Sequence, residues 1–241
     1  MRLSRIYTAQ PLILGTETIL EDSIAHYLSK VLRLRNEDQI SLFNERDGEF
    51  LATLLSIGKK SVSVRLEHRI ENQSESKLNV HLAIGISRGE RMDYAIQKAT
   101  ELGVSRITPL FTERCEVKIK ADRLDNRMGH WERVAISACE QSGRNVVPQI
   151  TTPLSIESFL SQALEGEGFV LDHRADNGLP TTISPKAVTF LIGPEGGLSE
   201  SEIGAANSAG FSSLRIGPRV LRTETAPVVA ISLAQQLWGD F

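Results

Sequence analysis

Two glycine-containing segments near the C-terminus have the residue types of a ligand-binding loop. The first, IGPEGGLSESEI at residues 192–203, follows a short β-branched and aromatic run that predicts a buried strand. Its glycines let backbone amides approach a ligand closely, and Ser199 and Glu202 have the spacing of a capping box, which predicts that a helix begins there. This order favours a ligand site at the carboxyl end of a strand. A tight turn without a ligand explains the same glycines equally well.

The second segment, LRIGPRVLRTETAPVV at residues 214–229, has the same plan of strand, Gly-Pro and helix. The polar residues 222–225 directly precede the predicted helix, where free backbone amides lie beside the fixed cation of an arginine. Proline fits only the first turn of a helix, so Pro227 indicates that this helix begins near Thr225 or Ala226. We expect the two loops to end neighbouring strands of one sheet, and together they favour a pocket more strongly than either loop alone.

Three further segments gather polar residues where a predicted strand or helix ends. Arg88 and Arg91 begin a predicted helix, where cations oppose the helix dipole; phosphate binding is one explanation and ordinary exposure another. The segment ACEQSGRNVVP at residues 138–148 ends a helix with a dense polar set. Cys139 within it is a candidate nucleophile, although a lone helical cysteine is more often a small core residue. His173 follows another strand and is a candidate general acid or base, although an ordinary loop histidine is the stronger explanation.

The elements that position these segments form two patterns, one on each side of the polar linker ENQSESK at residues 71–77. Before the linker, short strands and a helix over residues 23–32, capped by Asp22, predict a small barrel of roughly 70 residues. The strands there are expected at residues 3–7, 39–43, 49–57 and 61–66. After the linker, strands and helices alternate, which predicts a mostly parallel sheet covered on both faces. Its strands are expected at residues 80–86, 107–111, 169–172, 188–192 and 213–216, and its helices at residues 91–102, 127–142, 155–164 and from 225 to 238.

Composition and missing motifs argue against several classes of protein. A net charge of −3 over 241 residues excludes a uniformly basic nucleic-acid binder, although local arginine groups are compatible with phosphate binding. No apolar run reaches the roughly 18 residues that span a bilayer, and the N-terminus lacks the apolar core of a secretion signal. Two cysteines and no zinc-spaced cluster predict a cytoplasmic protein without a metal. The absence of G-x-G-x-x-G and of GxxxxGK disfavours a dinucleotide dehydrogenase, a Rossmann-type methyltransferase and a P-loop ATPase.

Four ordered motifs together resemble the RsmE family of ribosomal RNA methyltransferases, which modify N3 of a uridine in small-subunit (16S) RNA. The motifs are SRGERMDYAIQKATELGVSRITPL, ACEQSGRNVVP, IGPEGGLSESEI and LRIGPRVLRTETAP, and residues 26–50 are similar to the PUA-like barrel of that family. The resemblance implies an RNA-binding PUA-like β-barrel over residues 1–72 and a SPOUT-type α/β domain with a C-terminal trefoil knot over residues 77–241. It also implies a homodimer that acts on 16S rRNA in the small ribosomal subunit, binds S-adenosyl-L-methionine in the knot, and requires neither a metal nor a membrane.

The resemblance further implies roles for individual residues. The residues expected to line the cofactor site are Gly193, Pro194, Glu195, Gly196, Gly197, Ile216, Gly217, Leu221, Arg222, Thr225 and Ala226, with Leu171 and His173 as weaker candidates. The residues expected to contact RNA are Arg88, Arg91 and Arg144, with Arg2, Arg5, Lys30, Arg33 and Arg35 in the barrel. Arg222 is expected to stabilise the uracil anion that forms when N3 loses its proton. Glu140, Glu224 and water in contact with the site are the alternatives for the base.

Three other functions stay open on the sequence alone. A different SPOUT enzyme would use the same cradle to methylate a ribose 2′-oxygen or another base, and the EQSGR and LRTETA motifs argue against it. A catalytically silent RNA-binding protein is disfavoured by the intact glycine loops and by Arg222. A nucleotide-dependent enzyme of another doubly wound fold would be distinguished by the cofactor that it binds.

Overall fold

The computed structural model describes residues 3–58 and 61–241, and the contacts within it divide the chain into two compact units. The units consist of residues 1–75 with 139–147 and of residues 76–138 with 148–241. Helix α3 (Ala121–Ser142) begins in the second unit, and its C-terminal residues belong to the first. The chain therefore contributes to the first unit twice, at its start and again after the middle of its length.

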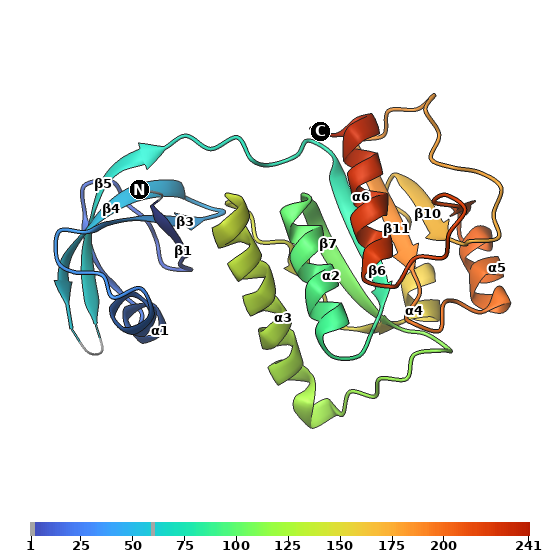
Figure 1. Ribbon diagram of the computed structural model, residues 1–241, viewed down its shortest axis with the longest axis horizontal. Helices are drawn as coiled ribbons and strands as arrows, with labels where there is room; N and C mark the ends of the chain where they lie inside the picture. The colour runs from blue at the N-terminus through green and yellow to red at the C-terminus, as the bar shows by residue number, and fades with distance from the viewer. Residues whose placement is uncertain (1–2, 59–60) are drawn as a thin grey trace. The chain divides into compact units, whose positions relative to one another are not determined.

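The first unit is built around a five-stranded sheet (Figure 1). Its elements, in chain order, are β1 (Ser4–Tyr7), β2 (Glu17–Leu20), α1 (Asp22–His26), the π-helical turn η1 (Tyr27–Val31), β3 (Gln39–Asn44), β4 (Gly48–Ile57) and β5 (Val62–Ile70). The strand order is β1-β3-β4-β5-β2. Strands β1 and β3 pair in parallel, and the other pairs are antiparallel.

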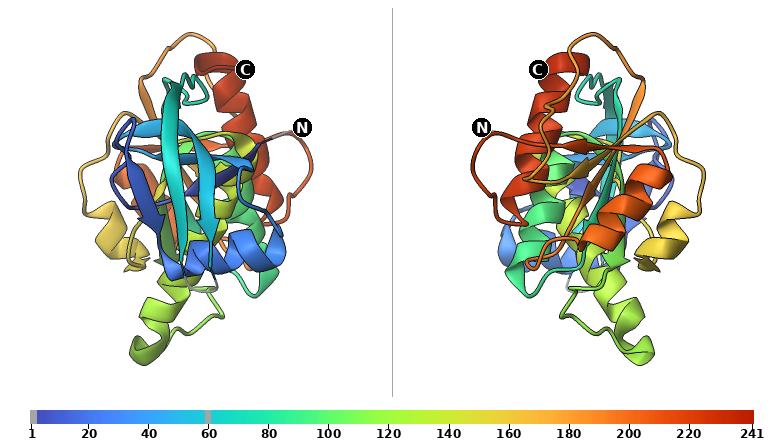
Figure 2. Two further views of the ribbon diagram at one scale, coloured as in Figure 1. Left: turned by 90° about the vertical axis from the view of Figure 1, so that its left-hand side faces the viewer. Right: turned by 90° about the vertical axis from the view of Figure 1, so that its right-hand side faces the viewer.

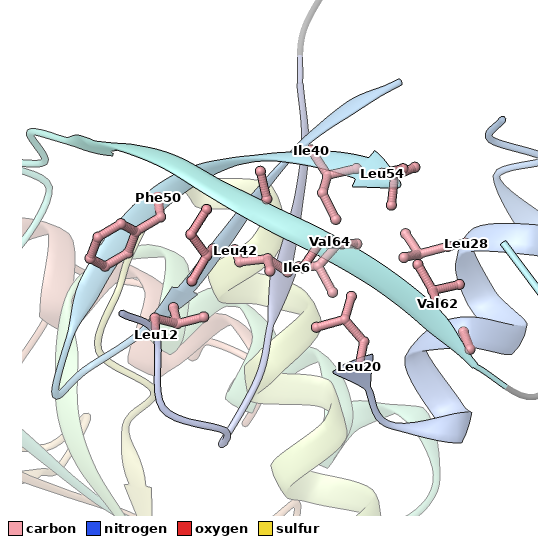
Figure 3. Close-up of a cluster of buried hydrophobic side chains, with 13 residues drawn as sticks. Ile6, Leu12, Leu20, Leu28, Ile40, Leu42, Phe50, Leu54, Val62 and Val64 are labelled. Carbon is pink, nitrogen blue, oxygen red and sulfur yellow. The ribbon is translucent and has the colours of Figure 1, made fainter. Parts of the chain in front are cut away.

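Alternation of side chains along the strands forms the core of the first unit. In β5, Val62, Val64 and Leu66 are fully buried, whereas Arg65 between them is exposed. Successive side chains of a strand point to opposite faces, so one face of β5 carries the apolar residues. Figure 3 shows these valines in one cluster with apolar side chains of β3 and β4 and with Leu28 of η1. Burial of Leu28 in this cluster explains why the helical segment packs on the sheet.

The helix of the first unit differs from the sequence prediction. Asp22, predicted to be the helix cap, is instead the first helical residue, and Glu21 before it makes no side-chain cap hydrogen bond. Aspartate is favoured both at the cap and in the first turn, so its residue type does not decide between the two positions. The α-helix ends at His26 and continues as η1. Strand β2 has a single buried residue, Leu20, and is too weakly patterned for the sequence to reveal it.

The second unit is an α/β fold around a seven-stranded sheet. Its strands are β6 (Asn79–Gly85), β7 (Val104–Phe111), β8 (Gln149–Ile150), β9 (Leu154–Ser155), β10 (Glu167–Leu171), β11 (Ala187–Ile192) and β12 (Phe211–Leu214). Its helices are α2 (Glu90–Glu101), the larger part of α3, α4 (Ile156–Leu160), α5 (Glu200–Ser208) and α6 (Thr225–Trp238). The strand order is β12-β10-β11-β6-β7-β8, β9 also pairs with β7, and each of these pairs is parallel.

Helices cover both faces of this sheet, which confirms the predicted layers. Helix α2 packs against α6 on one face, and α4 packs against α5 on the other (Figure 2, right). Phe190, Leu191 and Ile192 of the central strand β11 are all buried, because a parallel strand inside a covered sheet meets apolar side chains on both faces. Across residues 3–58 and 61–241, no helix combines the length and apolarity needed to cross a membrane.

The elements of the second unit lie close to their predicted positions, with differences at their ends. Helix α3 begins at Ala121 rather than at residue 127, and α4 ends early, at Leu160. Strand β12 ends at Leu214 rather than at residue 216. Terminal residues contribute few core contacts, so periodicity predicts that an element exists better than where it ends. Strands β8 and β9 contain two residues each, which is too short for periodicity to detect.

Candidate active site

A pocket opens at the carboxyl ends of β10, β11 and β12, within the second unit. Its cavity of about 650 Å³ is in the size range of cofactor sites. The loops after β11 and β12 form two of its walls, but they do not end neighbouring strands as predicted, because β10 lies between β11 and β12. Chain order does not reveal strand order in a sheet with crossover connections. The end of β10 and the segment after it lie between these two loops and form a third wall with Leu171, Asp172 and His173.

Close backbone packing shapes the loop after β11. A Cβ atom on Gly193 would lie 2.7 Å from the carbonyl carbon of Gly197 and from the backbone nitrogen of Leu198, so only glycine fits there. Gly197 has a φ angle of 69°, and its N–H donates to the Pro194 carbonyl at 2.8 Å, which closes the turn. The loop is therefore a compact turn made of backbone, as the glycine spacing predicts.

Helix α5 begins at the capping box that the sequence predicts. The Ser199 hydroxyl accepts a hydrogen bond from the Glu202 N–H at 3.3 Å, and Glu202 accepts one from the Ser199 N–H at 2.8 Å. Glu202 Oε1 also accepts from the N–H of Glu113 at 2.8 Å, and Arg114 donates to the Gly196 carbonyl at 3.0 Å. The segment after β7 therefore stabilises the glycine loop and the start of α5 through these two hydrogen bonds. No sequence motif indicates this support, because the partners lie 82 and 89 positions apart.

The Glu195 carboxylate ties the same loop to the segment that follows β6. Its Oε1 atom accepts from the backbone N–H of Arg88 at 3.0 Å and from Nη1 of Arg91 at 2.9 Å. Burial raises the pKa of Glu195, but the hydrogen bonds from Arg88 and Arg91 outweigh it and hold the pKa below its ordinary value. Arg91, which also lines the pocket, is therefore already paired with an ionised carboxylate. The Arg88 side chain pairs at the surface with Glu116 at 2.8 Å.

The arginines at the pocket mouth differ in whether they have partners. Arg174 binds Asp172 at 3.1 Å and Glu200 at 2.7 Å. Arg219 and Arg222 are exposed lining residues, and neither side chain forms an ion pair in the part of the chain that the structure describes. Two guanidinium groups are thus left to interact with an anion from outside the chain.

Glu224 follows Arg222 in the same wall and presents a buried acceptor. Its Oε2 atom has no hydrogen-bond partner among residues 3–58 and 61–241. A buried carboxylate oxygen without a donor carries a desolvation cost, and such a group calls for an explanation in a native structure. In the same described residues, no group of three or more His, Cys, Asp or Glu side chains is arranged to hold a metal ion.

The structure brings nearly all of the predicted cofactor residues together around one pocket. Those that line the pocket are Leu171, His173, Gly193, Pro194, Glu195, Gly196, Gly197, Ile216, Gly217, Leu221, Arg222 and Ala226. Thr225, an exposed residue at the start of α6, is not among the residues that line the pocket. Lining residues that the sequence analysis misses include Arg114, Asp172, Leu198, Arg219 and Thr223. Leu198, Arg219 and Thr223 lie inside motifs already singled out, so their position in the sequence was a usable signal, whereas Arg114 and Asp172 lie outside those motifs.

The other base candidate, Glu140, belongs to the first unit. Its carboxylate accepts a hydrogen bond from the Tyr7 N–H at 3.1 Å, and burial raises its pKa above the ordinary value. Cys139 beside it is fully buried, and burial raises the pKa of its thiol to about 11. A nucleophilic cysteine needs a thiolate near neutral pH. The nucleophile interpretation is therefore wrong, and Cys139 is a core residue.

Two of the predicted RNA contacts are internal ion pairs of the first unit. The Arg5 side chain is 10% exposed and donates to Glu49 at 3.0 Å and to the Cys139 carbonyl at 2.6 Å. The Arg144 side chain is 4% exposed and pairs with Glu75 at 2.9 Å. The prediction that these guanidinium groups bind phosphate is wrong, because internal acceptors already occupy their donors. Of the other predicted contacts in the first unit, Lys30, Arg33 and Arg35 are exposed, and Arg2 lies outside the described residues.

Two family models match the chain. One, described as an RNA methyltransferase domain, matches residues 74–235, and one described as an RNA methyltransferase PUA domain matches residues 20–67. Ribosomal RNA small subunit methyltransferase E of Buchnera aphidicola subsp. Acyrthosiphon pisum is 36% identical over 242 residues, which cover 100% of this chain and 96% of that protein. The protein of the same name from Rickettsia conorii is 32% identical over 244 residues, which cover 98% and 97%.

Two solved structures are similar over the whole chain. A putative methyltransferase from Legionella pneumophila in complex with its cofactor SAM has a TM-score of 0.95 at 40% identity. A ribosomal RNA small subunit methyltransferase E from Neisseria gonorrhoeae, bound to S-adenosyl methionine, has a TM-score of 0.92 at 37% identity. In both comparisons, 100% of each chain is covered.

Proposed function

The chain belongs to the RsmE family of S-adenosylmethionine-dependent ribosomal RNA methyltransferases, and from this premise we propose that it methylates N3 of one uridine in 16S RNA. Its N-terminal domain is PUA-like, and its second domain is an α/β methyltransferase domain. The observation that carries the proposal is the pocket itself, where a backbone-lined glycine loop lies beside Arg222, a cation without a partner in the described chain. Because its proposed substrate is the small ribosomal subunit, we expect the protein to be cytoplasmic.

The proposal includes finer structural assignments. We assign residues 1–72 to a PUA-like β-barrel and residues 77–241 to a SPOUT-type domain with a C-terminal trefoil knot. Tight packing where the loop after β11 meets the end of β6 supports the second assignment: a Cβ atom on Gly85 would overlap Pro194. The Thr223 hydroxyl then joins the C-terminal segment to Gly193 at 2.9 Å.

The residues of the pocket fit S-adenosylmethionine. The cavity of about 650 Å³ suits a nucleoside-sized ligand. At its glycines the loop carries no side chains, so the backbone there lies open to close approach by a ligand. The Glu224 carboxylate lines the same cavity and complements a cationic ligand. When bound, the cofactor supplies an electrophilic methyl group. The lining residues of the three walls hold and orient the cofactor, and Thr225 is not among them.

Two side chains of the segment after β12, Arg222 and Glu224, act on the acceptor base. Uracil N3 carries a proton that must leave, and the negative charge then spreads over the two ring carbonyl oxygens. The guanidinium of Arg222 stabilises that charge in a site prepared before the reaction. Glu224 accepts the proton, with water in contact with the pocket as the alternative acceptor. Glu224 is favoured over Glu140, because Glu224 lines the pocket and Glu140 is bonded to the backbone of Tyr7.

Exposed cations of both domains provide the contacts to RNA phosphates. In the second domain these are Arg88 and Arg91, with Arg219 beside the pocket. In the first domain they are Lys30, Arg33 and Arg35. Arg2, also predicted to contact RNA, lies outside the described residues. Phosphate contacts fix the register of an RNA and make binding depend on salt.

The test of the proposal is methyl transfer from labelled S-adenosylmethionine to unmodified small ribosomal subunits, with the product nucleoside identified by mass spectrometry. We expect 3-methyluridine. A different methylated nucleoside would overturn the assignment of the acceptor atom. Failure to bind the cofactor in a calorimetric titration would instead favour a silent RNA-binding protein.

We also propose that the protein acts as a homodimer through the outer face of α6. Val229, Leu233 and Leu237 of α6 recur at four-residue intervals, and Leu233 and Leu237 are each 41% exposed. Residues four apart lie on one side of a helix, so these side chains form an apolar stripe that a second copy would cover.

Charge introduced into this stripe should dissociate the dimer. We expect Leu233→Asp with Leu237→Asp to shift the sedimentation coefficient from dimer to monomer, because an aspartate in an apolar interface is not paired. Ala205→Asp, at an exposed position of α5, is the matched control and should leave the dimer intact. A monomeric wild-type protein, or a double variant that stays dimeric, would contradict the assignment.

A further inference from the structure

Three segments of the second unit meet at one buried threonine. Thr223 is 8% exposed, and its hydroxyl donates to the carbonyl oxygen of Gly193 at 2.9 Å. The hydroxyl of Ser87, which is 5% exposed, lies 3.3 Å from that of Thr223. The single hydrogen of the Thr223 hydroxyl is used in the bond to Gly193, so the Thr223 oxygen is the acceptor in this second contact, and the Ser87 hydroxyl has the Gly85 carbonyl oxygen, at 3.4 Å, as a second acceptor for its own hydrogen. The resulting chain from Ser87 through Thr223 to Gly193 joins the segments that follow β6, β12 and β11.

The acceptor at the end of this chain has a fixed position. Gly193 packs so closely on Gly197 that an added Cβ atom would lie 2.7 Å from its carbonyl carbon. Next to it, Pro194 crosses the end of β6 at Gly85, where a Cβ atom would overlap the proline ring. Backbone packed this tightly does not shift without opening the turn. A hydrogen bond to the Gly193 carbonyl therefore fixes the segment that donates it.

The donor segment carries the two residues with proposed chemical roles. Arg222 precedes Thr223 and Glu224 follows it, and both line the pocket. The carbonyl of Arg222 accepts from the N–H groups of Thr225 and Ala226, each at 2.9 Å, at the start of α6. The segment is thus held on its C-terminal side by the helix and at its centre by the Thr223 hydroxyl.

We propose that Thr223 is a positioning residue of the methyl-transfer reaction. Its hydroxyl holds the backbone of Arg222 and Glu224 against the glycine loop, so that the guanidinium and the carboxylate address the same acceptor base. Thr223 acts through these neighbours and does not touch the reacting atoms. The inference rests on the proposed function, because it assigns a role within that reaction. Loss of the hydroxyl should therefore lower kcat more than it weakens cofactor binding.

Two substitutions at Thr223 separate the hydroxyl from the shape of the side chain. Thr223→Val keeps the β-branched shape and removes the hydroxyl, and we expect kcat with saturating subunits and cofactor to fall about tenfold, the rate equivalent of one hydrogen bond. Thr223→Ser keeps the hydroxyl and should stay within about twofold of wild type. The dissociation constant for S-adenosylmethionine, measured by calorimetry, should change less than kcat in both variants. Equal losses in Thr223→Val and Thr223→Ser would overturn the proposal.

A double-mutant cycle tests whether Thr223 acts through Arg222. In an Arg222→Ala background, Thr223→Val should reduce the remaining turnover by less than about twofold, because the group that it positions is gone. An undiminished tenfold loss there would mean that Thr223 has another role.

Ser87→Ala keeps the inference testable if Thr223→Val does not fold. This change removes the donor to Thr223 but leaves the bond to Gly193, so we expect a smaller loss of kcat, about threefold. Turnover of Ser87→Ala at the wild-type level, with Thr223→Val unfolded, would overturn the positioning role. A wild-type protein that transfers no methyl group would instead overturn the proposed function, so the two failures are distinguishable.

Discussion

Two arginines of the first unit and one arginine of the second are used in opposite ways. In the first unit, Arg5 and Arg144 are buried and bound to the carboxylates of Glu49 and Glu75. In the second unit, Arg222 at the pocket is exposed and has no ion-pair partner in the described residues. Arg144 and Arg222 both occur in polar stretches of sequence, whereas Arg5 lies within a predicted strand. The proposed role in the reaction belongs to an arginine that is left without a carboxylate, and residue type alone does not identify it.

The buried group of the first unit shows what a structural arginine requires. Glu49 accepts hydrogen bonds from Arg5 at 3.0 Å and from Asn72 at 2.9 Å, and also from the Ser41 hydroxyl. Burial raises the pKa of Glu49, but the hydrogen bonds from Arg5, Ser41 and Asn72 outweigh it and lower the pKa below its ordinary value. A charge removed from water needs such a complete set of partners. Arg222 lacks that set because an exposed cation keeps its water until a ligand replaces it.

The sharpest test of this contrast is Arg222→Ala. We expect kcat to fall by about 10² to 10³-fold, the usual cost of removing one preorganised group that stabilises developing negative charge. The melting temperature should stay near that of wild type, because no internal carboxylate loses its partner. Near wild-type turnover on small ribosomal subunits would contradict the electrostatic role of Arg222.

Glu49→Gln should have the reverse effect, on stability rather than chemistry. Removing the carboxylate leaves the Arg5 guanidinium without its charged partner, and we expect urea unfolding to show a loss of about 2 kcal/mol at neutral pH. The folded-state pKa of Glu49 lies below the unfolded value, so the ionised group stabilises the fold above about pH 4.3 and loses that contribution as the pH falls through the folded-state pKa. The difference between the two proteins should therefore narrow in acid, and a constant difference would contradict the ion-pair explanation.

Glu17→Gln is the matched control and the smallest expected effect. Glu17 pairs with Arg65 at 3.0 Å in the same unit, but the two side chains are 60% and 54% exposed. Exposed pairs contribute less than about 1 kcal/mol because water and salt screen them. Urea unfolding of this variant should nearly match wild type, and a loss as large as that of Glu49→Gln would show that burial does not explain the contrast.

Local patterns predicted much of the second unit. Alternating apolar segments indicated the parallel sheet, Ser199 and Glu202 indicated the start of α5, and Pro227 indicated the start of α6. Each of these signals acts over a few residues, so a single sequence contains it completely. Patterns failed where structure depends on distant partners. The placing of β10 between the two glycine loops is one case, and the support of Gly196 by Arg114 is another.

The sequence by itself determined which segments carry the chemistry, because glycine spacing, capping residues and the order of the motifs are local properties of the chain. Only the tertiary structure decided how each charge is used. The sequence analysis predicts Arg5 and Arg144 to contact RNA, whereas the structure pairs them with Glu49 and Glu75. The sequence does not distinguish Thr223 from its neighbours, but in the structure its hydroxyl donates to the carbonyl of Gly193, 30 positions away. A side chain's role depends on its burial and its partners, and folding brings those partners from distant parts of the chain.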